Sequence, residues 1–234
     1  MLPQNDHTFS LQEKEQILLN FLRNELQMKA ETEYHDPSDT VDDWKRALNG
    51  RYSDTEQVHY KLCKNFFLHH KKKKQQKFYG VALADTMVDM NSMSKQLGLG
   101  SGNLRFADPE DLATFLDIQP GHVTPLCFHV LHPSVQKQRP DVLKKGNDES
   151  PSVVENMKTL TIIVDAALLR KNSNTSATTM LLFHPLHNSA STSMSQEEFV
   201  KFMKSCFGEE AWQQVIVYDF ETKTKLTIHD VDFN

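Results

Sequence analysis

Two apolar segments joined by a lysine-rich turn are the feature that most constrains the fold of this chain. Residues 60–68 and 78–84 carry mainly aromatic and aliphatic side chains, and positions 71–76 between them are all lysine or glutamine. Two strand-like segments at this spacing predict an antiparallel hairpin. Similar apolar segments predict further strands at 104–106, 126–131, 159–164, 180–183 and 215–220.

Helix signals lie around these strands. Ser10 with Glu13, and Ser195 with Glu198, form capping boxes ahead of amphipathic stretches. Further helices are expected at 40–48, from Asn91 to Gly98, and at 109–116. Because strands and helices mix without strict βαβ alternation, we expect an α/β protein of the mixed α+β kind. Its sheet should be mixed and partly antiparallel, open or barrel-like, with helices packed on it.

The length of the chain limits the number of domains. With 234 residues, 38% of them hydrophobic, it can bury one good core, so we expect a single domain over residues 1–234. Residues 132–158 are polar, contain three prolines and show no periodicity, which predicts a long mobile insertion. Residues 221–234 form an extra C-terminal segment.

Composition predicts a soluble cytoplasmic protein with no membrane contact. The three cysteines are widely spaced and form no C-x-x-C pair, which indicates reduced thiols in a reducing compartment. The N-terminus lacks the order of a signal or transit peptide, and the longest apolar stretch, 160–169, is too short to span a bilayer. A net charge of −5 argues against a surface covered with basic residues that would bind a long nucleic acid.

The basic residues are unevenly distributed. Seven lysines lie in the seventeen residues from Lys61 to Lys77 without one acid among them. Lys71, Lys72, Lys73 and Lys74 form the turn, whereas Lys64 lies inside a predicted strand. This local patch suits a partner that presents a few phosphates, such as the end of a tRNA. The alternative is an ordinary solvated turn.

Two glycine-containing loops could approach a ligand. The loop at 98–103 has the pattern G-x-G-x-G but follows a helix and precedes a strand, the reverse of a dinucleotide-binding loop. The segment from Gly121 to Pro125 brackets three amides that could point into a pocket, although an ordinary turn would have the same pattern. His184, His187 and Asn188 directly follow a predicted strand, which is a usual place for site residues.

Other catalytic chemistries find little support. The pairs His129/His132 and His184/His187 lack the companion residues of a zinc motif, so we expect neither a metal nor another cofactor. No G-x-S-x-G motif occurs, and nothing near Cys63 marks it as an activated nucleophile.

Taken together, residues 63–68, 95–107 and 121–125 and the Phe183-His184-Pro185 segment with Asn188 resemble the YbaK/ProX family of trans-editing aminoacyl-tRNA deacylases. These are relatives of the insertion domain of bacterial prolyl-tRNA synthetase. The order and spacing of the set are specific, although each motif alone is weak. The likeness covers roughly residues 12–220, breaks at 132–158, and is greatest for the alanyl-tRNA(Pro) deacylases of the ProXp-ala type. An extra residue near His35 and the tail after Phe220 depart from the pattern.

The resemblance implies which residues form the site. Catalytic roles are expected for Lys64, Asn65, Gly121, Thr124, Pro125 and His184. Contacts with tRNA are expected for Lys71, Lys72, Lys73, Lys74, Ser101, Gly102, Asn103, Arg105 and Asn188. The implied reaction needs no nucleophilic side chain, because an aminoacyl ester beside a ribose hydroxyl is already labile and positioning can supply much of the acceleration.

The function implied is hydrolysis of mischarged tRNA(Pro), above all Ala-tRNA(Pro), with bulkier proline excluded sterically. Aminoacyl-tRNA synthetases or a multi-synthetase complex are further expected partners. Two alternatives stay open: a Cys- or Ser-tRNA deacylase of the same family, and a non-catalytic protein that binds tRNA or a synthetase.

Overall fold

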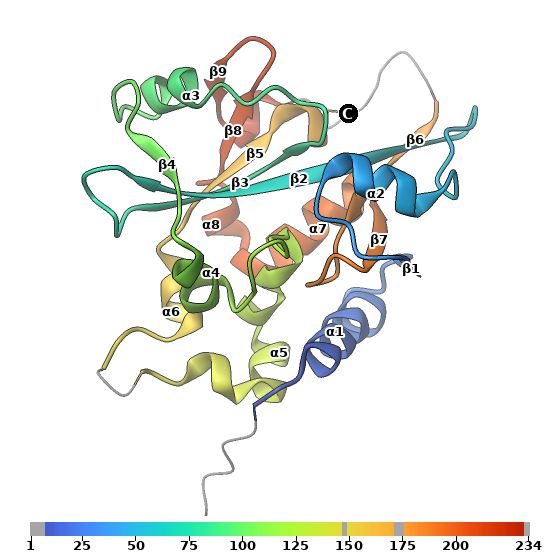
Figure 1. The fold of residues 1–234 in the computed structure, drawn as a ribbon, viewed down its shortest axis with the longest axis horizontal. Coiled ribbons are helices and arrows are strands. Elements are labelled where there is room, and N and C mark those ends of the chain that lie inside the picture. The colour runs from blue at the N-terminus through green and yellow to red at the C-terminus, as the bar shows by residue number, and fades with distance from the viewer. Residues whose placement is uncertain (1–7, 147–148, 171–175, 232–234) are drawn as a thin grey trace, which may run out of the picture.

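One long strand organises the sheet in the computed structural model, which describes residues 8–146, 149–170 and 176–231. The strand order is β1-β7-β6-β2-β3-β5-β8-β9, and β4 also pairs with β2 (Figure 1). The strands are β1 (Glu31–Tyr34), β2 (Val58–His70), β3 (Lys77–Leu83), β4 (Leu104–Phe106), β5 (Thr161–Asp165), β6 (Thr178–Phe183), β7 (Ala190–Ser195), β8 (Ile216–Asp219) and β9 (Thr224–Leu226). Parallel and antiparallel pairs both occur, which confirms the mixed sheet, and pairing among the described strands leaves it open rather than barrel-like.

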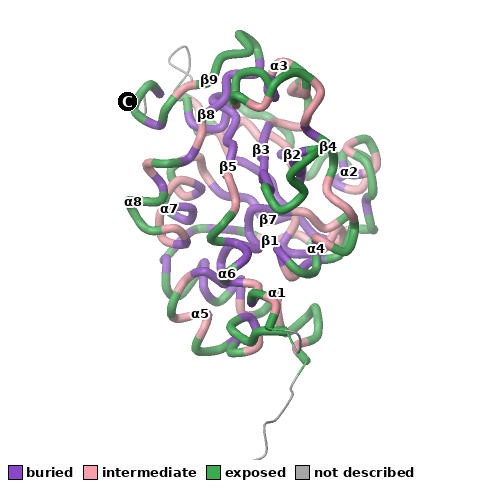
Figure 2. Tube along the Cα trace, turned by 90° about the vertical axis from the view of Figure 1, so that its left-hand side faces the viewer, coloured by how far each residue is buried: buried purple, intermediate pink, exposed green. Residues whose placement is uncertain are grey.

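Helices cover both faces of β2 unequally. The larger core joins the sheet to α1 (Leu11–Asn20), α4 (Pro109–Leu116), α5 (Pro133–Gln138), α6 (Val153–Lys158), α7 (Gln196–Phe207) and α8 (Glu209–Trp212). Two smaller cores lie under α3 (Met90–Gln96) and α2 (Val41–Leu48). In Figure 2 the buried residues follow the strands through the middle, and the outer helix faces are exposed.

The strand β2 changes partners along its length. It pairs in parallel with β6 over residues 58–62, and antiparallel with β3 over 63–69 and with β4 over 68–70. The predicted hairpin of β2 and β3 is therefore confirmed. Between Leu62 and Leu68, one edge of β2 has no partner among the described strands. Lys64 and Asn65 lie in this gap, with their side chains on opposite faces because successive side chains of a strand alternate.

Most helix starts agree with the capping signals. The boxes at Ser10 and Ser195 form as predicted, and Asn49 ends α2 in the left-handed conformation at φ 43°. The predicted cap at Asn91 is wrong: α3 begins at Met90, because the Asp89 carboxylate accepts hydrogen bonds from the amides of residues 91 and 92.

The predicted strand at 126–131 is wrong. Residues Pro125–Leu131 form a 3₁₀-helix that begins where the Thr124 hydroxyl accepts a hydrogen bond from the Leu126 amide. All seven of its residues are buried. Burial on every side produces an uninterrupted apolar run, which periodicity alone cannot assign to a strand or a helix.

The segment 132–158 also differs from its prediction, because it contains α5, a 3₁₀-helix at Pro140–Leu143 and α6. Arg139 holds it to the rest of the molecule. The guanidinium is fully buried and donates hydrogen bonds to Asp117 at 2.8 Å and to Asp141 at 2.6 and 2.9 Å. The C-terminal segment adds β9, which pairs with β8.

Candidate functional site

Asn65 connects the gap in β2 to the 121–125 loop. Its side-chain Nδ2 donates a hydrogen bond to the Val123 carbonyl at 3.0 Å, and its Oδ1 accepts one from the Tyr79 hydroxyl at 3.1 Å. Tyr79 is fully buried. Asn65 is thus held from the core and in turn holds the loop against the sheet.

The 121–125 loop presents backbone amides. Gly121 has φ +83°, a conformation that other residues rarely adopt, and a Cβ placed there would meet nothing within 4 Å. The glycine therefore serves the turn itself. Thr124 is buried as the cap of the 3₁₀-helix that Pro125 opens. Among the described residues, the amide of half-buried Val123 has no hydrogen-bond acceptor, so it can still donate to a ligand, whereas Thr124 is fully buried.

His184 supplies a neutral ring. Its Nδ1 lies 2.8 Å from the Ala190 carbonyl, which can only accept, so Nδ1 carries the proton and Nε2 keeps its lone pair. The ring packs on Trp44 with centroids 4.1 Å apart. Burial lowers the pKa of His184 from 6.5 to about 4, so at neutral pH the ring is a hydrogen-bond acceptor at Nε2.

The sequence analysis did not select Trp44, His35 or His122, and the rings of the first two lie beside the His184 ring. Trp44 on α2 donates from Nε1 to the Ser191 hydroxyl at 2.6 Å, and His35 Nε2 lies 2.8 Å from the same oxygen. His122, from the 121–125 loop, has a pKa lowered mainly by burial. The one available signal was the position of His122 inside the G-x-x-x-P segment; His35 and Trp44 lie far from His184 in sequence.

Lys64 lies on the opposite face of β2 from Asn65. Its Nζ donates to the carbonyls of Ala84, at 3.0 Å, and Thr86. Burial lowers the pKa of Lys64, while the charges of Asp85 and Asp165 oppose that effect. An ammonium has three N–H donors, so one remains for a ligand oxygen.

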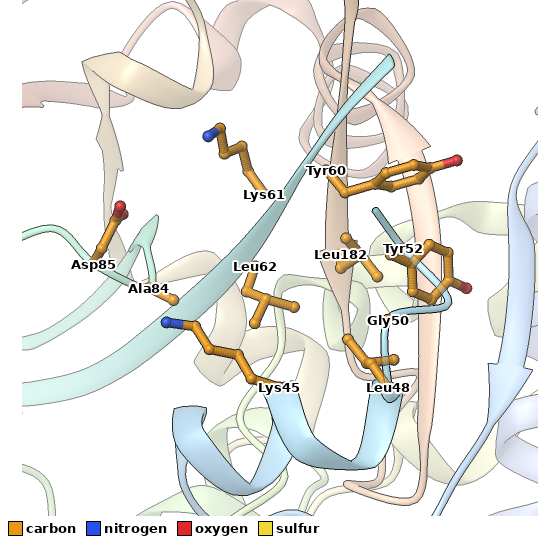
Figure 3. A pocket seen from close by; sticks show the side chains of 10 residues that line it. All are labelled: Lys45, Leu48, Gly50, Tyr52, Tyr60, Lys61, Leu62, Ala84, Asp85 and Leu182. Carbon is orange, nitrogen blue, oxygen red and sulfur yellow. The ribbon is translucent and has the colours of Figure 1, made fainter. Parts of the chain in front are cut away.

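A cavity of about 330 Å³ lies between α2, β2 and the turn after β3, which holds the carbonyl partners of Lys64 (Figure 3). Its lining includes Ala84, whose carbonyl accepts from Lys64. Leu48 and Leu182 also line it and belong to the same apolar cluster as Trp44, the neighbour of His184. The cavity is therefore adjacent to a backbone partner of Lys64 and to the apolar cluster that contains Trp44.

The lysine turn is partly neutralised. Lys74 pairs with Asp108 at 2.9 Å, and buried Lys77 pairs with Asp111, so the turn is opposed by acids that are distant in sequence. Lys71, Lys72 and Lys73 remain exposed.

The predicted tRNA contacts at 101–105 gather beside this turn. The Lys71 amide donates to the Asn103 carbonyl at 2.7 Å, and exposed Arg105 pairs with His69 in the β4–β2 ladder. Ser101 is exposed and Gly102 half-buried in the same loop. Six residues separate Lys64 from the end of β2, so this surface lies roughly 20 Å from Lys64 at about 3.3 Å per residue.

Asn188 has a local structural role. Its Nδ2 donates to Asp39 at 2.8 Å, and its carbonyl accepts from the Ser38 amide at 3.0 Å. Across the described parts of the chain, no three His, Cys, Asp or Glu side chains gather in a way that could hold a metal ion.

Comparison with known proteins settles the family. The pattern of the aminoacyl-tRNA editing domain matches residues 35–202, which include the gap in β2, the 121–125 loop and His184. The chain belongs to the aminoacyl-tRNA editing domain family. The resemblance seen in the sequence is therefore confirmed at the level of the family.

Two relatives are similar in sequence to part of this editing-domain chain. It is 33% identical over 141 residues to the prolyl-tRNA synthetase associated domain-containing protein 1 of Xenopus laevis, and 31% identical over 142 residues to that of Mus musculus. These alignments span 60% and 61% of this chain and 66% of each relative, just under two thirds of the relative's own length.

A solved structure shows the same fold. It is described as a candidate trans-editing enzyme for prolyl-tRNA synthetase, and it matches 91% of this chain and 98% of its own with a TM-score of 0.50 and 15% identity. Among the described residues, no helix is long and apolar enough to cross a membrane.

Proposed function

We propose that this editing-domain protein hydrolyses the ester of mischarged tRNA(Pro), most readily Ala-tRNA(Pro), in the cytoplasm. The observation that carries the proposal is the Asn65 tether, which holds the 121–125 loop, with the Val123 amide as a donor, against the gap in β2. His184, held neutral by burial and packed on Trp44, supplies a second polar group from the family motif.

The reaction follows from these groups. Water attacks the ester carbonyl, the bond from that carbon to the ribose oxygen breaks, and the free amino acid and the tRNA hydroxyl are the products. The amide of half-buried Val123 would donate to the developing oxyanion. His184 Nε2 would accept a hydrogen bond from the substrate or the attacking water. The third donor of Lys64 would bind a phosphate or ribose oxygen near the ester.

The amino-acid preference would be steric. Alanine offers no polar side-chain group, so the site can recognise only its bulk and its α-amino group. A wall formed by the 121–125 loop would refuse the proline ring, because overpacking is costly. Serine and cysteine differ from alanine by one atom and are the alternative substrates. The names of the relatives point to prolyl-tRNA synthetase, and aminoacyl-tRNA synthetases or their complexes are the partners we propose.

The test is hydrolysis of tRNA(Pro) charged separately with alanine, serine, cysteine or proline, with excess protein and the loss of ester followed over time. We expect the fastest loss for alanine and none above the spontaneous rate for proline. Lys158→Gln, an exposed position in the last turn of α6, serves as the matched control with unchanged turnover. Equal inactivity on all four esters, with tRNA still bound, would favour the non-catalytic alternative.

A further inference from the structure

The turn after β3, residues 84–86, carries the two carbonyls that hold Lys64. The ammonium donates to the Ala84 carbonyl at 3.0 Å and to the Thr86 carbonyl. In the part of the chain that the structure describes, the Lys64 ammonium forms no ion pair with a carboxylate. The position of its Nζ is therefore set by where the turn places these two oxygens.

Apolar packing does little to fix this turn. Its first residues, Ala84 and Asp85, line the cavity of about 330 Å³ under α2. Thr86, at its end, lines a second cavity of about 220 Å³, as does Met87, which is 87% exposed. A segment with few buried apolar contacts has low local stability unless hydrogen bonds hold it. The hydrogen bonds of the turn therefore decide its conformation.

Hydrogen bonds tie both ends of the turn to the sheet. At its start, the Ala84 amide donates to the Leu62 carbonyl of β2 at 2.8 Å. At its end, the Thr86 hydroxyl donates to Asp165 Oδ2 at 2.8 Å. The Thr86 amide donates to the Leu83 carbonyl, which closes the turn on itself. The link to Asp165 thus fixes the end of the turn that carries the Thr86 carbonyl.

Asp165 is a rigid anchor for this link. It is buried at the end of β5, which pairs in parallel with β3 on one side and with β8 on the other. Its Oδ1 accepts from the Ala167 amide at 3.0 Å, and its Oδ2 also accepts from the Leu83 amide at 3.4 Å. Replacing Asp165 would disturb all of these donors, so Thr86 is the residue of the pair to vary.

We infer that Thr86, held by Asp165, is the positioning residue for the Lys64 ammonium. A carboxylate on β5, the hydroxyl and carbonyl of Thr86, and the ammonium on β2 form one chain of hydrogen bonds. The two carbonyls use two of the three N–H donors of Lys64, so fixing the carbonyls fixes the direction of the third. That direction matters, because a misplacement of about 1 Å can slow a reaction by about 100-fold. The inference rests on the proposed function, in which the third donor binds an oxygen near the ester, and deepens it.

The first measurement observes Lys64 without a substrate, by heteronuclear NMR of the intact protein labelled at the lysine ammonium nitrogens. The spectrum of Lys64→Met assigns the Lys64 signal. We expect that signal in the wild-type protein, because hydrogen bonds slow the exchange of its protons with water, and its loss in Thr86→Val, which lacks the hydroxyl. Thr86→Ser restores a hydroxyl and should restore the signal. Thr114→Val, which removes an exposed hydroxyl from α4, is the matched control and should keep it.

The second measurement is single-turnover loss of the ester from Ala-tRNA(Pro) at saturating protein. We expect the rate to fall about tenfold in Thr86→Val, with little change in tRNA affinity, and to return in Thr86→Ser. Adding Thr86→Val to Lys64→Met should slow the reaction no further, because Thr86 acts through Lys64. A merely structural threonine would slow the wild-type and the Lys64→Met backgrounds by the same factor.

The two measurements separate the outcomes, and circular dichroism checks that each variant is folded. An unchanged ammonium signal in Thr86→Val, or an equal loss of rate in both backgrounds, would overturn the inference. If the signal is lost as expected and neither the wild-type protein nor any variant hydrolyses an ester, the positioning of Lys64 by Thr86 stands and the proposed catalysis fails.

Discussion

Replacing Asn65 with alanine tests the tether between the sheet and the 121–125 loop. The change removes the bond to the Val123 carbonyl at 3.0 Å and the bond from the Tyr79 hydroxyl at 3.1 Å. Two such bonds contribute about 1 kcal/mol each, and the fully buried Tyr79 hydroxyl is left without an acceptor at a further cost of about 1–3 kcal/mol. We expect the free energy of unfolding to fall by about 3–5 kcal/mol in total, and Tm by roughly 6–20 °C.

The effect on catalysis should be separable from the effect on stability. With the loop untethered, the Val123 amide is no longer held in place, and kcat for Ala-tRNA(Pro) should fall roughly 10–100-fold. Tyr79→Phe alone keeps the tether and should retain turnover. In Asn65→Ala with Tyr79→Phe, no buried hydroxyl is orphaned, so about 1–3 kcal/mol of the lost stability should return while kcat stays low.

The assays are chemical denaturation for stability and single-turnover loss of the ester for catalysis, at a temperature where all variants are folded. Recovery of both stability and kcat in the double variant would refute the reasoning, because the tether would then act only through the fold. Wild-type kcat in Asn65→Ala would refute it as well.

Four further outcomes are expected. Lys64→Met should lower deacylation at saturating tRNA and release the turn at residues 84–86, which hydrogen exchange would detect as faster amide exchange of Thr86. Replacing Lys71, Lys72 and Lys73 by glutamine should weaken tRNA binding and flatten its salt dependence, with little change in single-turnover rate at saturation. Gly121→Ala should cost about 1–2 kcal/mol through its positive φ and lower turnover more than tRNA binding, with Gly121→Asn the milder control. Burial lowers the pKa of His184 and of His129 from 6.5 to about 4. Each histidine therefore contributes stability above pH 6.5 that is lost as the pH falls towards 4, by about 3 kcal/mol apiece. Chemical denaturation at a series of pH values would measure this loss in the free energy of unfolding.

Local signals in the sequence determined much of the secondary structure. Capping boxes and turns depend on hydrogen bonds between residues three or four apart, so Ser10, Ser195 and the hairpin at 71–76 were predictable without the fold. The family resemblance also rested on short motifs in order. These signals failed where burial on all sides hid the period, as in Pro125–Leu131.

The arrangement of the site was decided only by the tertiary structure. Asn65 and Val123 are 58 residues apart, and Trp44 and Ser191 are 147 apart, so no local pattern records either contact. The same applies to Lys74 and Asp108, whose pairing removes a lysine that the sequence left unopposed. Alternation along β2 puts Lys64 and Asn65 on opposite faces, but what each face meets depends on strands and loops brought together by packing of the core.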